Sequence, residues 1–174
     1  MADPATTFSP IDLALVQVTV SRQSRGSVSS AIANELGIEL PPTGRSASAG
    51  DLLILGLGPE RWLVIAEKTD GWALEKRLMT LAAGNALVAD QSDGRAVFAL
   101  TGPSAQDVLA LGCGLDLDAS VFPAGACAGT DIAGIQAFLW RPKETAFRMA
   151  VPRSMAQSFA HWAETSLQAV LHRP

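Results

Sequence analysis

Residues 88–109 read VADQSDGRAVFALTGPSAQDVL. Two apolar stretches, 86–90 and 95–101, have the composition of strands, and a polar Asp-x-Ser turn separates them. The chain then passes through Gly102 and Pro103 into a short predicted helix, because proline fits a first helical turn that needs no backbone donor. This order of strand, turn, strand and helix is the basis of the fold prediction.

One pattern repeats on the two sides of this stretch. We predict an internal duplication of a strand-helix-strand-strand-helix unit, in a single α+β domain over residues 11–174. Its pseudo-repeats cover about residues 11–90 and 91–174. A loop is expected over residues 38–50, and residues 1–10 are expected to be a flexible tail.

Individual elements follow from periodicity and from helix-capping residues. Asp70 is predicted to cap a helix that ends at Gly84, and the last helix is predicted to begin at Pro152. The other predicted elements are strands at 14–20, 51–57, 61–67, 127–132, 135–141 and 145–151, and a helix over 26–36.

Composition limits the classes of function. The net charge of −4 and the absence of a basic cluster argue against nucleic acid or an anionic membrane as partner. No apolar run is long enough to span a bilayer, and no signal peptide is visible, so we expect a cytoplasmic protein. The apolar share of 48% against 17% charged residues is compatible with a large subunit interface.

The residues that most often carry chemistry are few and scattered. Cys113 and Cys127 have no CxxC spacing, and we expect free thiols. His161 on the last helix has no evident nucleophile to activate, and the carboxylates of Asp116 and Asp118 have no histidine nearby to complete a metal site. We therefore predict no catalytic, cofactor-binding or metal site.

Other side chains are candidates for structural or interface roles. Asp90 and Ser92 can hydrogen-bond to backbone N–H groups at the join between the halves, and Arg95 can pair with Asp90 or Asp93. Large apolar side chains more often fill cores or anchor interfaces than bind ring ligands. The apolar candidates are Trp62, Trp140, Met155, Phe159 and Trp162.

The stretch from Asp90 onward resembles the gamma subunit of heterotetrameric sarcosine oxidase. The resemblance runs from about Asp90 to Leu167 and covers the first half more weakly. The matching segments are Asp90–Arg95, Leu100–Ala105, Asp107–Leu109, Gly112–Cys113, Leu115–Leu117 and Phe122–Pro123. More distantly, the same stretch is similar to the folate-binding domain of the glycine-cleavage T protein, which is also an internal duplication.

This resemblance implies a non-catalytic subunit of a complex that demethylates sarcosine oxidatively to glycine with peroxide as a product. FAD, FMN, NAD and tetrahydrofolate are then expected on the other chains. The implied partners are the alpha, beta and delta subunits of a heterotetramer, chiefly the large alpha subunit.

An alternative is a stand-alone tetrahydrofolate-binding aminomethyl or methylene transferase. It requires a folate-sized apolar pocket with a convergent carboxylate, from Asp131 or Asp90. The T protein has paired aspartates after its Gly-Gly turn, whereas residues 129–138 here contain only Asp131, which lies too early. We therefore do not infer folate chemistry for this chain from its similarity to the T protein.

Overall fold

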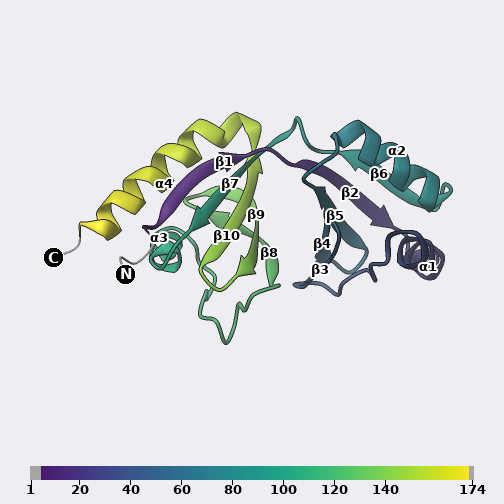
Figure 1. Cartoon of the computed structure of the whole chain (residues 1–174), viewed down its shortest axis with the longest axis horizontal. Helices are drawn as coiled ribbons and strands as arrows, with labels where there is room; N and C mark the ends of the chain where they lie inside the picture. The colour runs from purple at the N-terminus through teal and green to yellow at the C-terminus, as the bar shows by residue number, and fades with distance from the viewer. Residues whose placement is uncertain (1–4, 173–174) are drawn as a thin grey trace. The chain divides into compact units, whose positions relative to one another are not determined.

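The computed structural model describes residues 5–172, which form two compact units (Figure 1). The middle unit comprises Asp12–Asp93, and the terminal unit combines the residues up to Ile11 with those from Gly94 onward. Each unit contains one five-stranded sheet together with helices, so the predicted α+β class is confirmed. That residues 11–174 form a single domain stays a prediction.

The middle unit has a sheet of order β3-β4-β5-β2-β6 in which all neighbours are antiparallel. Helices α1 and α2 contribute Val28, Ile32, Leu74 and Leu78 to a core beneath that sheet. The elements are β2 (Ala14–Val20), α1 (Arg25–Leu36), β3 (Ser46–Ala49), β4 (Leu52–Gly58), β5 (Arg61–Ala66), α2 (Gly71–Ala82) and β6 (Ala86–Asp90).

The terminal unit has a sheet of order β1-β7-β10-β9-β8, again antiparallel throughout. Its core joins Leu109 of α3 and Phe159 of α4 to Phe98 and Phe147 of the sheet. The elements are β1 (Thr7–Ile11), β7 (Arg95–Thr101), α3 (Ala105–Ala110), β8 (Cys127–Ile132), β9 (Ile135–Lys143), β10 (Ala146–Pro152), the 3-10 turn η1 (Arg153–Met155) and α4 (Ala156–Leu171).

Local sequence explains where the helices of the middle unit begin and end. The Asp70 carboxylate accepts a hydrogen bond from the Ala73 N–H at 2.7 Å, which satisfies a free donor at the start of α2 as predicted. Helix α1 ends at Gly37, which adopts a left-handed φ of 66°. Helix α2 ends earlier than predicted, because Ala83 already takes a left-handed φ of 46° before Gly84.

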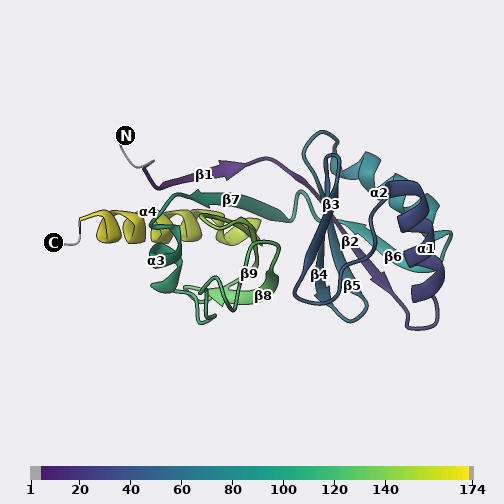
Figure 2. The same ribbon diagram turned by 60° about the horizontal axis from the view of Figure 1, so that its bottom comes forward.

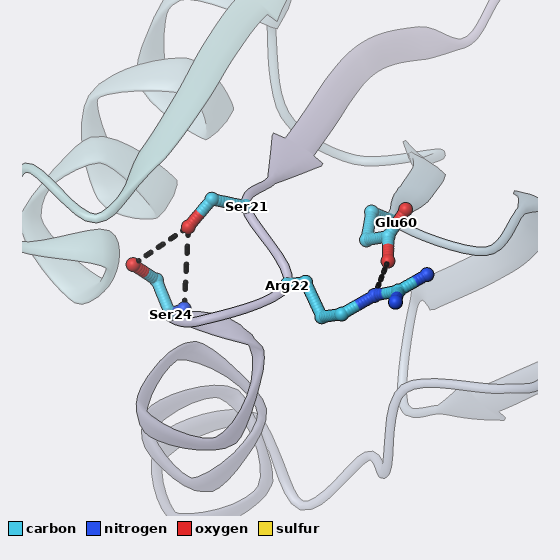
Figure 3. A network of polar contacts seen from close by, with 4 residues as sticks. All are labelled: Ser21, Arg22, Ser24 and Glu60. Carbon is cyan, nitrogen blue, oxygen red and sulfur yellow. Dashed lines mark hydrogen bonds and ion pairs between the residues drawn. The ribbon is translucent and has the colours of Figure 1, made fainter.

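Polar contacts organise the connection between β2 and α1 (Figure 3). The Ser21 hydroxyl accepts a hydrogen bond from the Ser24 N–H at 3.2 Å and lies 3.1 Å from the Ser24 hydroxyl. Arg22 forms an ion pair of 3.5 Å with Glu60, but its side chain is 91% exposed. Water screens such a pair, so it contributes little to stability.

The structure corrects the prediction of a flexible tail over residues 1–10. Residues 1–4 lie outside the described part of the chain, but Thr7–Ile11 form β1, which pairs antiparallel with β7 from Thr7↔Thr101 to Ile11↔Val97 (Figure 2). Phe8 stacks on Phe98 with ring centroids 5.1 Å apart. The polar composition concealed this strand, because its partner lies about ninety residues further along the chain.

Two other expectations also need correction. The predicted loop over residues 38–50 contains β3, whose small side chains give a weak strand signal although its backbone pairs with β4. Three strands therefore lie between α1 and α2, instead of the two that were predicted there, and this matches the three strands predicted between the helices of the second repeat. Pro152 ends β10 and does not start the last helix, which begins with the turn at Arg153–Met155.

We predict that Phe8→Ala destabilises the terminal unit. Phe8 is half-buried against Phe98 and Phe159, so the truncation should cost about 2 kcal/mol, less than for a fully buried ring. The urea midpoint of unfolding measures the effect, and Ser9→Ala, at an exposed position of the same strand, is the control. An unchanged midpoint for Phe8→Ala would show that the packing of this ring on Phe98 and Phe159 contributes nothing to stability.

Candidate functional site

The predicted Asp-x-Ser turn is present at the end of β6. One carboxylate oxygen of Asp90 accepts hydrogen bonds from the Ser92 N–H at 2.8 Å and from the Ser92 hydroxyl at 2.6 Å. The Ser92 hydroxyl in turn accepts from the Leu15 N–H at 3.0 Å, and the Gln91 N–H donates to the Leu15 carbonyl. The turn thus fastens the end of β6 to the beginning of β2.

Helix α2 lies against this turn at its first residues. The Glu75 carboxylate accepts from the Asp90 N–H at 3.0 Å. A Cβ placed on Gly71 would lie 2.3 Å from both Asp90 carboxylate oxygens and 2.4 Å from the Ser92 hydroxyl. Only glycine fits there, because the hydrogen bonds within the turn hold the carboxylate in place. Sequence patterns missed Gly71 and Glu75, since neither stands close to Asp90 along the chain.

A pocket of about 360 Å³ opens beside the turn, within the middle unit. Five carboxylate residues line it and no lysine or arginine does. Trp72 is the one aromatic residue among those that line it. The lining residues are Asp12, Leu13, Ala14, Glu67, Thr69, Asp70, Gly71, Trp72, Asp90, Ser92 and Asp93.

The acidic side chains of the pocket are its main candidates for chemistry. No histidine or cysteine lines it, and Asp70 and Asp90 already hold backbone groups as a helix cap and a turn. The Ser92 hydroxyl already donates to Asp90 and accepts from Leu15, which opposes its use as a nucleophile. Among residues 5–172 there is also no cluster of three or more histidine, cysteine or acidic side chains able to hold a metal ion.

Arg95 lies in the terminal unit, at the start of β7. Its guanidinium carbon is 4.0 Å from the centre of the Phe138 ring, close enough for a cation–π interaction. One guanidinium nitrogen donates to the Ala150 carbonyl at 3.5 Å. Its pairing with Asp90 or Asp93 stays a prediction.

The tryptophan candidates occupy different environments. Trp62 is buried, and its indole N–H donates to the Pro41 carbonyl at 2.8 Å, while the Arg25 guanidinium lies 5.6 Å from its ring. Trp140 is buried in β9 opposite Cys127. Each of these tryptophans therefore has its place inside its own unit.

The apolar candidates at the last helix divide between core and surface. Phe159 is fully buried, and the half-buried Trp162 packs against it with centroids 5.6 Å apart. Met155 precedes α4 and is 40% exposed. A Cβ on Gly112 would come within 2.5 Å of the Trp162 ring, so this glycine permits the close packing of that ring.

The other residues considered for chemistry lie apart. Cys113 and Cys127 are buried and are not joined in a disulfide, and His161 is exposed on α4. Asp118 accepts hydrogen bonds from the hydroxyl and N–H of Ser120, which lower its pKa below the usual 3.8, with a smaller contribution from the charge of Arg141. Asp131 is exposed on β8.

Arg141, which sequence reasoning missed, is a buried cation in β9. It donates at 2.8 Å to the carbonyls of both Leu117 and Phe122, and through two nitrogens to the carbonyl of Glu144. Its guanidinium carbon also lies 4.8 Å from the centre of the Phe147 ring. In the sequence Arg141 stands at the end of an apolar run, directly before a charged turn, and this position does not indicate burial. In the structure it fastens the loop between α3 and β8.

Comparison with known proteins gives the family. The family described as "Sarcosine oxidase, gamma subunit family" matches residues 23–168. The chain belongs to this family. The resemblance inferred from the sequence is therefore confirmed.

Individual relatives agree with the family. The chain is 33% identical over 134 residues to a sarcosine oxidase subunit gamma from Arthrobacter sp., a match that covers 76% of this chain and 66% of the relative. The chain thus spans slightly less than two thirds of that relative's length.

Solved structures agree in fold. A chain of the heterotetrameric sarcosine oxidase from Corynebacterium sp. U-96, solved with pyrrole 2-carboxylate, has a TM-score of 0.87 at 24% identity, covering all of this chain and 89% of its own. The glycine cleavage aminomethyltransferase T from Bartonella henselae has a TM-score of 0.67 at 20% identity, covering 92% of this chain and 46% of its own. The predicted T-protein-like fold is confirmed.

We predict that Gly71→Ala destabilises the middle unit by about 1–3 kcal/mol, because the added methyl group must displace Asp90 or Ser92. Gly26→Ala is a matched control in the first turn of α1, where a Cβ would meet nothing within 4 Å. There alanine should be neutral or stabilising, since it favours the helix. Equal urea midpoints for the two variants would contradict the proposed close contact.

We also predict that Arg141→Met destabilises the terminal unit by about 3 kcal/mol, since it leaves buried carbonyls without their charged donor. Amide hydrogen exchange should then increase in the loop between α3 and β8. Lys143→Met, at an exposed position of the same strand, is the control. Unchanged exchange in Arg141→Met would show that the guanidinium does not hold this loop.

Proposed function

We propose that this chain is a non-catalytic subunit of a heterotetrameric sarcosine oxidase, in which it packs against the other subunits and chiefly the large alpha chain. Membership of the gamma subunit family carries this proposal. The match in fold over the whole chain to a chain of a heterotetrameric sarcosine oxidase supports it. In the assembly, the other subunits demethylate sarcosine oxidatively to glycine.

The geometry of the acidic pocket supports a structural role. Its Asp90 and Ser92 groups fasten β6 to β2, and Asp70 caps α2, so these side chains serve the fold. The pocket has no histidine or lysine to work with a carboxylate in general acid-base catalysis. On this proposal the chain contributes stability and assembly, and FAD, FMN, NAD and tetrahydrofolate bind to other subunits.

Reconstitution tests the proposed role. We predict that alpha, beta and delta chains from the same source, purified without this chain, give a complex with reduced stability and sarcosine oxidase activity, and that adding the chain restores both. Size-exclusion chromatography measures the assembly and peroxide release measures the activity. Full and stable activity without this chain would refute the scaffold role.

The alternative transferase function has less support. The likeness to aminomethyltransferase T, at 20% identity, concerns the fold alone. Calorimetry with tetrahydrofolate on the isolated chain separates the two functions, and no binding is expected for the scaffold. Tight binding that Asp90→Asn or Asp131→Asn abolishes would favour the transferase instead.

A further inference from the structure

Helix α2 carries two large apolar side chains on its exposed side. Trp72 is 66% exposed and Met79 is 57% exposed, while Leu74 and Leu78 on the opposite side are buried in the core. Residues seven apart lie on one face of a helix, so Trp72 and Met79 share a face, on which Glu75 and Lys76 lie between them. We call the surface that Trp72 and Met79 form the α2 face. Exposed tryptophan is frequent at the centres of protein interfaces.

The acidic pocket adjoins one end of the α2 face, because Trp72 is one of the residues that line it. Asp12 and Glu67 are exposed at the pocket, and in residues 5–172 neither forms an ion pair with a lysine or arginine. Asp70 and Asp90 add two further carboxylates, each bound through one oxygen to groups of its own turn. The surface thus joins an exposed aromatic ring to concentrated negative charge.

We infer that the α2 face and this pocket form a docking surface for another subunit, which inserts an arginine or lysine side chain between the Trp72 ring and the carboxylates. This inference rests on the proposed function. Carboxylates attract such a cation by complementary charge, and the indole ring attracts it through its electron-rich face. The Trp72 ring already attracts one cation, since the Lys76 ammonium lies 5.2 Å from its centre without lining the pocket.

Other occupants fit this surface less well. A second copy of the chain has the same net charge of −4, so two copies repel each other and long-range attraction is lacking. A small organic cation would fill the pocket but leave Met79, two turns along the helix, exposed. A protein segment that carries a basic side chain covers both parts of the surface.

Variants of the surface test the inference with purified subunits. Trp72→Ala and the double variant Asp12→Asn/Glu67→Gln should each weaken association with the alpha, beta and delta chains by about ten-fold or more. The double variant should also lose much of the dependence of affinity on salt. The changed side chains are exposed, so the urea midpoint of each variant should stay that of the original chain.

Matched controls lie in the terminal unit. Val121→Ala removes an exposed apolar side chain, and Glu164→Gln removes an exposed carboxylate of α4. Both should bind the other subunits as the original chain does. Equal affinity for Trp72→Ala and the controls would overturn the inference.

Failure of this inference is distinguishable from failure of the proposed function. If the original chain does not associate with the other subunits, the proposed function fails. If it associates and both surface variants bind equally well, only the docking surface fails. Sedimentation of the isolated chain tests the second copy: a dimer that Trp72→Ala dissociates would assign the surface to self-association and overturn the inference.

Discussion

The antiparallel pairing of β1 with β7 is the constraint on which the terminal unit depends. It supplies the strand that completes one edge of the sheet, and it brings Phe8 against Phe98 and Phe159. The Thr6 hydroxyl accepts from the Ser104 N–H at 3.0 Å, which ties the start of this strand to the beginning of α3. Gly102, with φ of 135°, allows that approach, since a Cβ there would lie 2.4 Å from the Thr6 Cα. One short strand thus joins the sheet and the helix.

The same constraint explains why the two units look alike although their chain order differs. In the middle unit, the strand next to β2 is β6, which follows α2 directly. In the terminal unit, the equivalent position next to β7 belongs to β1, which comes from the opposite end of the chain. With β1 in the place of β6, the two sheets have the same strand order. The terminal unit therefore takes its edge strand from the start of the chain, whereas the middle unit takes the equivalent strand from the end of its own segment.

Sequence patterns predicted what local chemistry determines. The Asp70 cap, the end of α1 after residue 36 and the Asp90 turn each depend on residues within four positions, and all three were predicted. None of the described helices is both apolar enough and long enough to cross a bilayer. The family also followed from motifs that lie close together in the chain.

Contacts between distant residues stayed hidden from those patterns. β1 has its partner far away, and the small side chains of β3 become a strand only beside β4. Gly71 contacts a turn that lies about twenty residues further along the chain. Arg141 of β9 binds the loop between α3 and β8. The acidic pocket likewise brings together three segments, around Asp12, Asp70 and Asp90. No single stretch of the sequence therefore contains all the acidic residues of the pocket.

The position of β1 has a topological consequence. A chain cut once, between Asp93 and Gly94, would give one fragment that holds the whole middle unit and also β1, and another that holds the rest of the terminal unit. The first fragment would still supply a strand to the sheet of the second, as in donor-strand complementation between separate proteins. The pairing of β1 with β7 inside the terminal unit would thus hold the two fragments together without a covalent bond.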